Sequence, residues 1–252
     1  MGQSSLALKK LSEESPAVSN ITRAIKASER AADLTKQLLA YSGRGKFLME
    51  TVDLNLLVRE NISILEVSVT KTAELRYELC NPSPCIIADS GQIQQVIMNL
   101  IINASDAMGT KPGVITVRTN SIELSRDDSK YSEYTHNPLA PGSYAKIQVR
   151  DTGSGISQET LTRIFDPFFT TKFTGRGLGL AAVLGIIKGH KGGLRIESEV
   201  GKGTMFEIVW PLVEASTISN ITEKKEIEIN GEGKTILVID DEFTVIELVN
   251  DV

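Results

Sequence analysis

The sequence predicts an α+β fold preceded by a helical hairpin, and two observations lead to this prediction. From residue 47 to about residue 214, short strand-like runs alternate with longer runs whose apolar residues recur every three or four positions. The first pattern is typical of strands and the second of amphipathic helices. Before residue 47 only the helical period is present. The first 214 of the 252 residues therefore divide into a helical part, residues 1–46, and a mixed part, residues 47–214.

The helical part is expected to form a helix, a turn and a second helix. Pro16 places the turn at residues 12–16, because proline disfavours helical backbone at the residue before it. After the turn, small and apolar residues alternate steps of three and four from Ala24 to Tyr41, and a second apolar stripe runs beside them. Two adjacent stripes suit a helix that packs on several others, as in a four-helix bundle.

The mixed part is expected to form a domain of its own. Its strand-like runs are Glu50–Leu54, Leu75–Leu79, Cys85–Ala88, Val114–Asn120, Tyr144–Asp151, Leu194–Glu199 and Met205–Trp210. Its helix-like runs are Asn55–Val67, Ser90–Met108, Gln158–Ile164 and Leu178–Lys188. Residues 125–142 are polar and contain two prolines, which predicts a surface loop.

Both ends of the chain are expected to lie inside larger units. Residues 18–41 span about 36 Å as a helix but residues 2–11 only about 15 Å, so the first helix of the hairpin is expected to be incomplete. Residues 215–233 are rich in Glu and Lys and are expected to be a linker. Residues 235–240 (TILVID) predict a buried strand, so residues 234–252 are expected to be the truncated start of another domain.

Composition and charge exclude several classes of function. Acidic residues number 32 and basic residues 27, and the net charge of −5 argues against a dedicated nucleic-acid binder. Cys80 and Cys85 are too few for a disulfide framework or a four-ligand zinc site, and they fit a reducing, cytoplasmic compartment. No apolar run approaches the roughly 20 residues of a membrane helix. We therefore expect no membrane contact within this segment, which leaves open a membrane anchor in a longer parent protein.

The first of four motifs is an apolar helix that carries asparagines, QQVIMNLIINASDAM at residues 94–108. Asn99 and Asn103 are four residues apart, hence on one face, and Asp106 follows three residues later. Buried amides are costly unless they are paired. This row therefore predicts either a ligand or amides that cap nearby backbone.

The second motif is a tight loop at the end of a strand, VRDTGSGI at residues 149–156. The strand carries Asp151 to its end, and Gly153 and Gly155 allow a ligand to approach the backbone. A carboxylate in this position can accept a hydrogen bond from an exocyclic amine. An ordinary turn explains the same residues equally well.

The third and fourth motifs adjoin each other. IFDPFFTTK at residues 164–172 joins three phenylalanines to two threonines and a lysine, which fits either a flap with a phosphate-binding tip or a plain hydrophobic cluster. In TGRGLGLAAV at residues 174–183, glycines lead into an apolar helix, whose free N–H groups and dipole would favour an anion. A flexible glycine-rich loop is the alternative. No strand precedes these glycines, so the dinucleotide-binding fingerprint is excluded.

Together and in this order, the four motifs resemble those of the ATP-binding catalytic domain of sensor histidine kinases, in the GHKL group with heat-shock chaperone, mismatch-repair and gyrase ATPases. They match its asparagine box, first glycine box, phenylalanine box and second glycine box, and residues 201–210 match its closing strand. The resemblance covers residues 17–213 and implies a two-layer α/β sandwich, the Bergerat fold. Residues 29–45 resemble the second helix of the kinases' dimerisation hairpin, and residues 236–242 (ILVIDDE) resemble the first strand of a receiver domain.

The resemblance implies a ligand, ATP with Mg²⁺, and a role for each motif. Asn103 would ligate Mg²⁺ that bridges the ATP phosphates, with Asn99 beside it. Asp151 would receive the adenine amino group, while Lys172 and Arg176 would meet the phosphates. The implied ATP-binding residues are Asn99, Asn103, Asp106, Asp151, Gly153, Gly155, Ile156, Phe165, Thr170, Thr171, Lys172, Arg176, Gly177, Leu178, Gly179 and Leu180.

Both ends of the implied phosphorelay are expected to be missing. The family's phosphorylated histidine lies on the first hairpin helix, whereas this chain has only His136 and His190, both expected to be solvated or capping residues. Asp240 and Asp241 match the Mg²⁺-binding acids of a receiver, but its phosphoacceptor would lie beyond Val252. No catalytic side chain is therefore assigned within the chain.

The chain is interpreted as part of a hybrid sensor histidine kinase, which transfers the ATP γ-phosphate to a histidine in two-component signalling. The implied partners are a second copy, bound through the hairpin in the full-length protein, and its own or a separate receiver domain. Two alternatives remain open. One is another GHKL-type ATPase, and the other is a non-catalytic ATP-binding scaffold module.

Overall fold

The computed structural model describes most of the chain between residues 15 and 213. The described residues are 4, 6–8, 11–12, 15–42, 48–62, 69–70, 72–125, 129–172 and 177–213. The predicted linker and receiver start, at residues 215–252, therefore lie outside the described residues. The chain divides into two compact units, Met1–Lys36 with Glu223–Val252 and Gln37–Thr222, and each is described by itself.

One long helix, α2 (Pro16–Ser42), confirms the predicted second helix of the hairpin. Proline is well suited to its first position, where its missing N–H would have no partner in the helix. The hydroxyls of Ser28 and Thr35 donate to the carbonyls four residues earlier, at 3.0 and 2.9 Å, so the helix satisfies these polar groups by itself. Among the described residues, no helix is long and apolar enough to cross a membrane.

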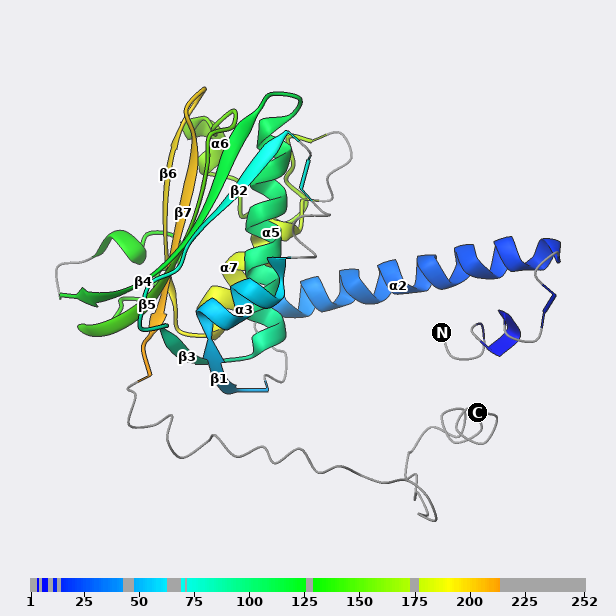
Figure 1. Cartoon of the computed structure of the whole chain (residues 1–252), viewed down its shortest axis with the longest axis horizontal. Coiled ribbons are helices and arrows are strands. Elements are labelled where there is room, and N and C mark those ends of the chain that lie inside the picture. Colours follow the sequence, from blue (N-terminus) through cyan, green and yellow to red (C-terminus); the bar gives the residue numbers. More distant parts are fainter. Residues whose placement is uncertain are drawn as a thin grey trace, which may run out of the picture. The chain divides into compact units, whose positions relative to one another are not determined.

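The mixed part of the chain forms a five-stranded sheet (Figure 1). In spatial order its strands are β2 (Ala73–Glu78), β4 (Gly113–Leu124), β5 (Gly142–Asp151), β7 (Gly203–Pro211) and β6 (Gly193–Glu199). β2 and β4 are parallel, and the other neighbours are antiparallel. A separate antiparallel pair joins β1 (Glu50–Asp53) to β3 (Cys85–Ala88).

Helices cover one face of this sheet (Figure 1). They are α5 (Ser90–Met108), α7 (Gly179–Gly189) and the short α3 (Leu54–Glu60). Residues 63–68, predicted to continue α3, lie outside the described residues. The apolar faces of these helices and alternate residues of the strands form one buried core, which includes Ile93, Ile97, Leu100, Ile147, Ile186, Ile208 and Trp210. This arrangement confirms the predicted two-layer α/β sandwich.

Several predicted element boundaries differ from the structure, and two of them have a clear local cause. Leu54 begins α3 instead of ending a strand, because the Asp53 carboxylate accepts a hydrogen bond from the Leu56 amide at 2.8 Å and caps the helix. The helix predicted at residues 158–164 is only α6 (Gln158–Leu161). Beyond it the backbone hydrogen bonds span three residues, so the chain continues as turns.

Residues 125–142, predicted as a polar surface loop, pack partly against the sheet. A 3₁₀ turn, η1 (Ser129–Tyr131), buries Tyr131 in a small cluster with Leu124, Tyr144 and Val209. Side chains alternate along a strand, so Tyr144 points away from the core residue Ala145 and the cluster lies on the face opposite the helices. A single buried tyrosine in a polar stretch has no periodic pattern, which is why the prediction missed this packing.

A buried carboxylate lies on the same face of the sheet. Glu207 is 4% exposed, and its two oxygens lie 3.0 Å from the Lys146 ammonium and 2.9 Å from the Arg195 guanidinium. Burial by itself raises the pKa of Glu207. The hydrogen bonds and charges of the two cations outweigh burial and hold this pKa below its usual value.

Glu207→Gln should lower the free energy of unfolding by about 1–3 kcal/mol at pH 7, because it takes the anion away from Lys146 and leaves Arg195 only Glu197 as an ion-pair partner among the described residues. Since the folded-state pKa is lowered, the stabilisation is complete above the unfolded value of about 4.3 and is lost as the pH falls through the folded pKa. Urea titrations should therefore show a smaller difference in the free energy of unfolding between wild type and Glu207→Gln at pH 3 than at pH 7. A difference that stays the same at both pH values would contradict this. The exposed Glu74→Gln, which also removes one carboxylate paired with an arginine, is the control and should have little effect.

Candidate functional site

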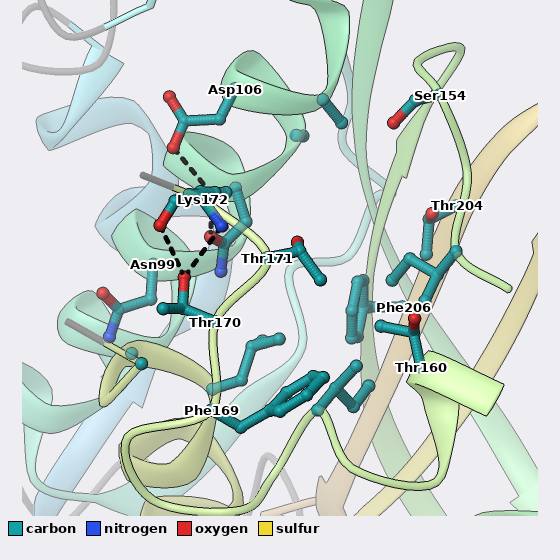
Figure 2. Close-up of a pocket in the computed structure, with 18 of the residues that line it drawn as sticks. Asn99, Asp106, Ser154, Thr160, Phe169, Thr170, Thr171, Lys172, Thr204 and Phe206 are labelled. Atoms are coloured by element: carbon teal, nitrogen blue, oxygen red, sulfur yellow. Dashed lines mark hydrogen bonds and ion pairs between the residues drawn. The ribbon is translucent and has the colours of Figure 1, made fainter. Parts of the chain in front are cut away.

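A cavity of about 440 Å³ opens beside α5, the first turn of α7 and the ends of β5 and β7 (Figure 2). This volume is in the range of small-molecule pockets. All four sequence motifs contribute residues to its wall. The predicted site residues that line it are Asn99, Asn103, Asp106, Asp151, Gly155, Ile156, Thr170, Thr171, Lys172, Gly177, Leu178, Gly179 and Leu180.

Phe165, which was predicted as a site residue, is not part of this wall. Its side chain packs on the core, and its ring meets that of Tyr134 edge to face with 5.3 Å between centroids. The phenylalanine of this motif that lies in the wall is Phe169, four residues further along. Phe168, between them, is 67% exposed. Three phenylalanines of one motif therefore have three different surroundings.

Gly153 does not line the cavity either, but it shapes the loop beside it. Its amide donates to the Asp151 carboxylate at 2.8 Å. A Cβ at this position would lie 2.7 Å from the carbonyl oxygen of Ala107, so the loop can pack on α5 only with glycine here. The remaining predicted residues, Arg176, Asp240 and Asp241, lie outside the described residues.

Several lining residues were not predicted from the sequence. Thr204 and Phe206 lie two apart on β7 and both face the cavity, because alternate residues of a strand share one face. Period-two alternation along this strand is the signal that would have found them. Others come from loops or from the short helix α6 and have no such signal, and Figure 2 shows Ser154, Thr160 and Phe169 around the same space.

Asp151, the last residue of β5, is the buried acid of the cavity. It is 5% exposed, and its Oδ1 accepts hydrogen bonds from the amides of Gly153 at 2.8 Å and Thr204 at 3.2 Å. Burial raises the pKa of Asp151, and the two hydrogen bonds oppose that rise. Among the described residues no hydrogen bond reaches Oδ2, so this oxygen is available to a donor on a ligand.

The polar row on α5 meets a lysine from the third motif. The Lys172 ammonium lies 2.7 Å from Asn103 Oδ1 and 2.7 Å from Asp106 Oδ2. A dashed line in Figure 2 marks the contact between Lys172 and Asp106. Asn99 lies one turn earlier, and its Nδ2 is buried with no hydrogen-bond partner among the described residues. A buried donor without a partner is costly. The atom therefore points to a polar group that a ligand would bring.

The first turn of α7 lies at the cavity, and within the described residues the backbone amides of its first three residues make no hydrogen bond. Its N-terminal residue Leu178 makes no side-chain capping hydrogen bond. Free amides and the helix dipole favour an anion at this position. Gly177 has a φ of +67°, and a Cβ there would lie 2.4 Å from the carbonyl carbon of Phe168, so only glycine allows the chain to enter the helix in this way.

Neither histidine lines the cavity. His190 is buried at the end of α7, where its Nε2 accepts from the Asp89 amide at 3.1 Å and its Nδ1 lies 2.9 Å from the Ile186 carbonyl. His136 is exposed, in the segment between β4 and β5. The two histidines were each expected to be solvated or capping, and the structure shows His190 at the C-cap of α7 and His136 exposed.

The geometry agrees with a family match that spans the whole site. A family model described as "Histidine kinase-, DNA gyrase B-, and HSP90-like ATPase" matches residues 88–214, which is half of the chain. The chain belongs to this family of ATPases. The matched residues of this ATPase domain include the four motifs, the helices α5 and α7, and every strand of the five-stranded sheet except β2.

Sensor kinases are the curated relatives of this ATPase-family chain. Sensor kinase CckA of Brucella abortus is 39% identical over 228 residues, which are 86% of this chain and 24% of the relative. Sensor histidine kinase ZraS of Escherichia coli is 32% identical over 200 residues, 79% of this chain and 37% of the relative. The chain thus spans less than two-fifths of either relative.

Solved histidine kinase structures share the fold of this domain. The catalytic domain of histidine kinase ThkA is 29% identical with a TM-score of 0.51, over 65% of this chain and 95% of that one. Full-length ShkA in complex with AMPPNP is 23% identical with a TM-score of 0.63, over 85% of this chain and 42% of that one. This ATPase domain is therefore an ATP-binding catalytic domain of the histidine kinase type.

Proposed function

We propose that the domain binds ATP together with Mg²⁺ and donates the γ-phosphate to a histidine that lies elsewhere than at His136 or His190. The observation that carries the proposal is one cavity that holds both a buried carboxylate, Asp151, and the free amides of the α7 N-terminus. The first suits a base with an exocyclic amine and the second suits phosphate. A nucleoside triphosphate has both groups.

Adenine is the base that this carboxylate favours. Oδ2 of Asp151 is an acceptor, and adenine presents an amino group where guanine presents a carbonyl oxygen. Oδ1 is held by two backbone amides, so the orientation of the carboxylate is set before the ligand enters. Side chains of Ile156, Ile164 and Phe206 give the same region an apolar wall. We therefore assign the base of ATP to the space beside Asp151.

The phosphates are assigned to α7 and Lys172. The free amides in the first turn of α7 are directed to the cavity, and Lys172 brings the positive charge among the described lining residues. Phosphoryl transfer depends mainly on positioning and charge neutralisation, which backbone amides and cations supply. Thr170 and Thr171 add hydroxyl groups in the same part of the wall.

Asn103 fits the role of magnesium ligand. Its Oδ1 already faces a cation, the ammonium of Lys172 at 2.7 Å, so the position suits positive charge. Within the described residues, no group of three or more His, Cys, Asp or Glu side chains could hold a metal by itself. Mg²⁺ commonly keeps several waters and binds through one or two protein oxygens plus phosphates. When bound, it would neutralise phosphate charge.

The wider system follows from the relatives. Curated relatives of this chain are sensor kinases, and ThkA has been solved in complex with the response regulator protein TrrA. We infer that the whole protein is a histidine kinase of two-component signalling, active as a homodimer through the hairpin that contains α2. Its phosphate would pass to a receiver domain, whose first strand and metal-binding acids, Asp240 and Asp241, are assigned to residues 234–252. Its ATP-binding part is assigned to the cytoplasm.

Incubation with γ-labelled ATP and Mg²⁺ tests this function. We expect calorimetry to show ATP binding, and acid-labile label to appear only on an added dimerisation domain that carries the family's acceptor histidine. ATP binding with label nowhere would favour a scaffold module. Phosphate release without acid-labile label would favour another ATPase of the group. Acid-labile label on this chain that disappears in His136→Gln or His190→Gln would overturn the proposal.

A further inference from the structure

The Lys172 ammonium already has two hydrogen-bond partners in the cavity. It donates to two oxygens of α5, those of Asn103 and Asp106, with both distances 2.7 Å. The Lys172 and Asp106 side chains are only partly exposed, at 39% and 46%. The two partners lie one helical turn apart on α5, so a single cation reaches both oxygens.

The backbone of the third motif holds the lysine in this place. The amide of Lys172 donates to Thr170 Oγ1 at 3.1 Å, and the Thr170 hydroxyl lies 3.4 Å from the Lys172 carbonyl (Figure 2). These bonds close a short local loop and fix the backbone from which the Lys172 side chain reaches α5.

Two consequences follow for a metal nucleotide. Mg²⁺ binds oxygen ligands at about 2.0–2.1 Å, so Mg²⁺ on Asn103 Oδ1 would lie in the space that the ammonium occupies at 2.7 Å. Two cations this close repel each other strongly. In addition, Asp106 and the phosphates compete for the same ammonium, because the described charged lining residues are Asp106, Asp151 and Lys172.

We propose that Lys172 and Mg²⁺ compete for Asn103 Oδ1, and that metal-bound ATP binds by exchange. On binding, the Lys172 ammonium would leave Asn103 and Asp106 for the phosphates, and Asn103 would hold the metal. Asp106 is then a positioning residue, which acts on the nucleotide mainly through Lys172. The inference rests on the proposed function, since it takes Asn103 as the metal ligand.

Manganese binding without nucleotide tests the first half of the exchange. Mn²⁺ shares the oxygen preference of Mg²⁺ and broadens nearby NMR signals. In Lys172→Met the oxygens of Asn103 and Asp106 lose their cation, so Mn²⁺ should broaden the side-chain amide signals of Asn103 at a several-fold lower concentration than in wild type. When Asp106→Asn is added to Lys172→Met, the Mn²⁺ concentration needed for broadening should return toward that of wild type. Arg76→Met, an exposed cation on β2, is the control and should behave as wild type. Equal broadening in wild type and Lys172→Met would overturn the proposal.

Calorimetry with metal-free ATP tests the second half. Asp106→Asn frees Lys172 for the phosphates, so it should tighten ATP binding by about two- to fivefold, the factor that corresponds to one partly exposed ion pair. In the Lys172→Met background Asp106→Asn should tighten ATP binding by a smaller factor. It then removes only the direct repulsion between the Asp106 carboxylate and the phosphates. An equal gain in both backgrounds, or weaker binding by Asp106→Asn, would overturn the exchange.

Adenosine separates this inference from the function on which it rests. It lacks phosphates, so neither Asp106→Asn nor Lys172→Met should change its affinity. A wild-type chain that binds neither adenosine nor ATP would contradict the proposed function, whatever the manganese result. A chain that binds both, but shows the same Asp106→Asn gain with and without Lys172, would contradict the exchange alone.

Discussion

Asp151→Asn should weaken ATP binding strongly while leaving the fold at least as stable as wild type. The carboxylate is the proposed acceptor for the adenine amine, and an amide can present its own NH₂ group there instead. A lost hydrogen bond to a charged group costs about 1.5–3 kcal/mol, which raises the Kd about 10- to 150-fold. Calorimetric titration of the folded variant with ATP measures this. An unchanged affinity would contradict the adenine assignment.

The fold should tolerate Asp151→Asn because the amide oxygen can still accept from Gly153 and Thr204, and burying an amide costs less than burying a charge. Burial raises the pKa of Asp151, so the folded chain holds more protons than the unfolded chain between the unfolded value of about 3.9 and the folded pKa. Relative to the variant, wild type should therefore gain stability as the pH falls through this window. The gain should stop below about pH 3.9. Denaturant titrations of both chains between pH 7 and pH 3 measure it.

Asp151→Ala is the matched variant for this experiment. It also removes the carboxylate, but it leaves the amides of Gly153 and Thr204 without an acceptor, which should cost about 1–3 kcal/mol of stability. Both variants should lose ATP affinity, and only the alanine variant should lose stability. If the asparagine variant is destabilised as much as the alanine variant, the ionised carboxylate is itself needed by the fold. GTP should bind poorly to wild type, because guanine has a carbonyl oxygen at the position where adenine has the amine that donates to Asp151.

Gly155→Ala should remove ATP binding and destabilise the domain together. Gly155 lines the cavity with a φ of +67°, and a Cβ there would lie 2.1 Å from the carbonyl oxygen of Glu199. Backbone atoms cannot give way as a flexible side chain would, so the loop must leave its packing against the turn between β6 and β7. We expect a loss of about 3 kcal/mol or more, at the upper end of single substitutions. Thermal unfolding and ATP calorimetry measure the two effects.

Gly201→Ala is the control that separates backbone strain from close packing. Gly201 also has a positive φ, +82°, but a Cβ there would meet no atom within 4 Å. Gly201→Ala should lower the free energy of unfolding only by the cost of the left-handed conformation, about 1–2 kcal/mol, and should keep the affinity for ATP. Equal losses in the two variants would show that strain alone matters at Gly155 and that its close approach to Glu199 does not.

Elements whose signals are local were predicted closely. The predicted helix at Ser90–Met108 has the bounds of α5, because Asp89 caps its start and Gly109, with a φ of +58°, follows its end. The strand predicted at Cys85–Ala88 is β3. Capping bonds and strand periodicity involve residues a few positions apart, so a short window of sequence contains the whole interaction.

The three phenylalanines of the third motif show where such signals end. Phe165 contacts the Tyr134 ring, Phe168 is exposed, and Phe169 lies in the cavity wall with the Arg163 guanidinium 4.4 Å from its ring centroid. They are the same residue type within five positions. Their environments differ because the turns after α6 pack against segments that are distant in the sequence.

The sequence by itself determined the order of elements, the four motifs and the family of ATP-binding domains to which they belong. Tertiary structure decided which side chains meet: Thr204 binds Asp151 from 53 residues away, and Lys172 reaches Asn103 across 69 residues. The packing of residues 129–131 on the sheet face opposite the helices is a third contact that the tertiary structure decided. The physical reason is the range of the interactions. Backbone propensity and periodicity act within one element, whereas these contacts exist only after sheet register and helix packing have brought separate elements together.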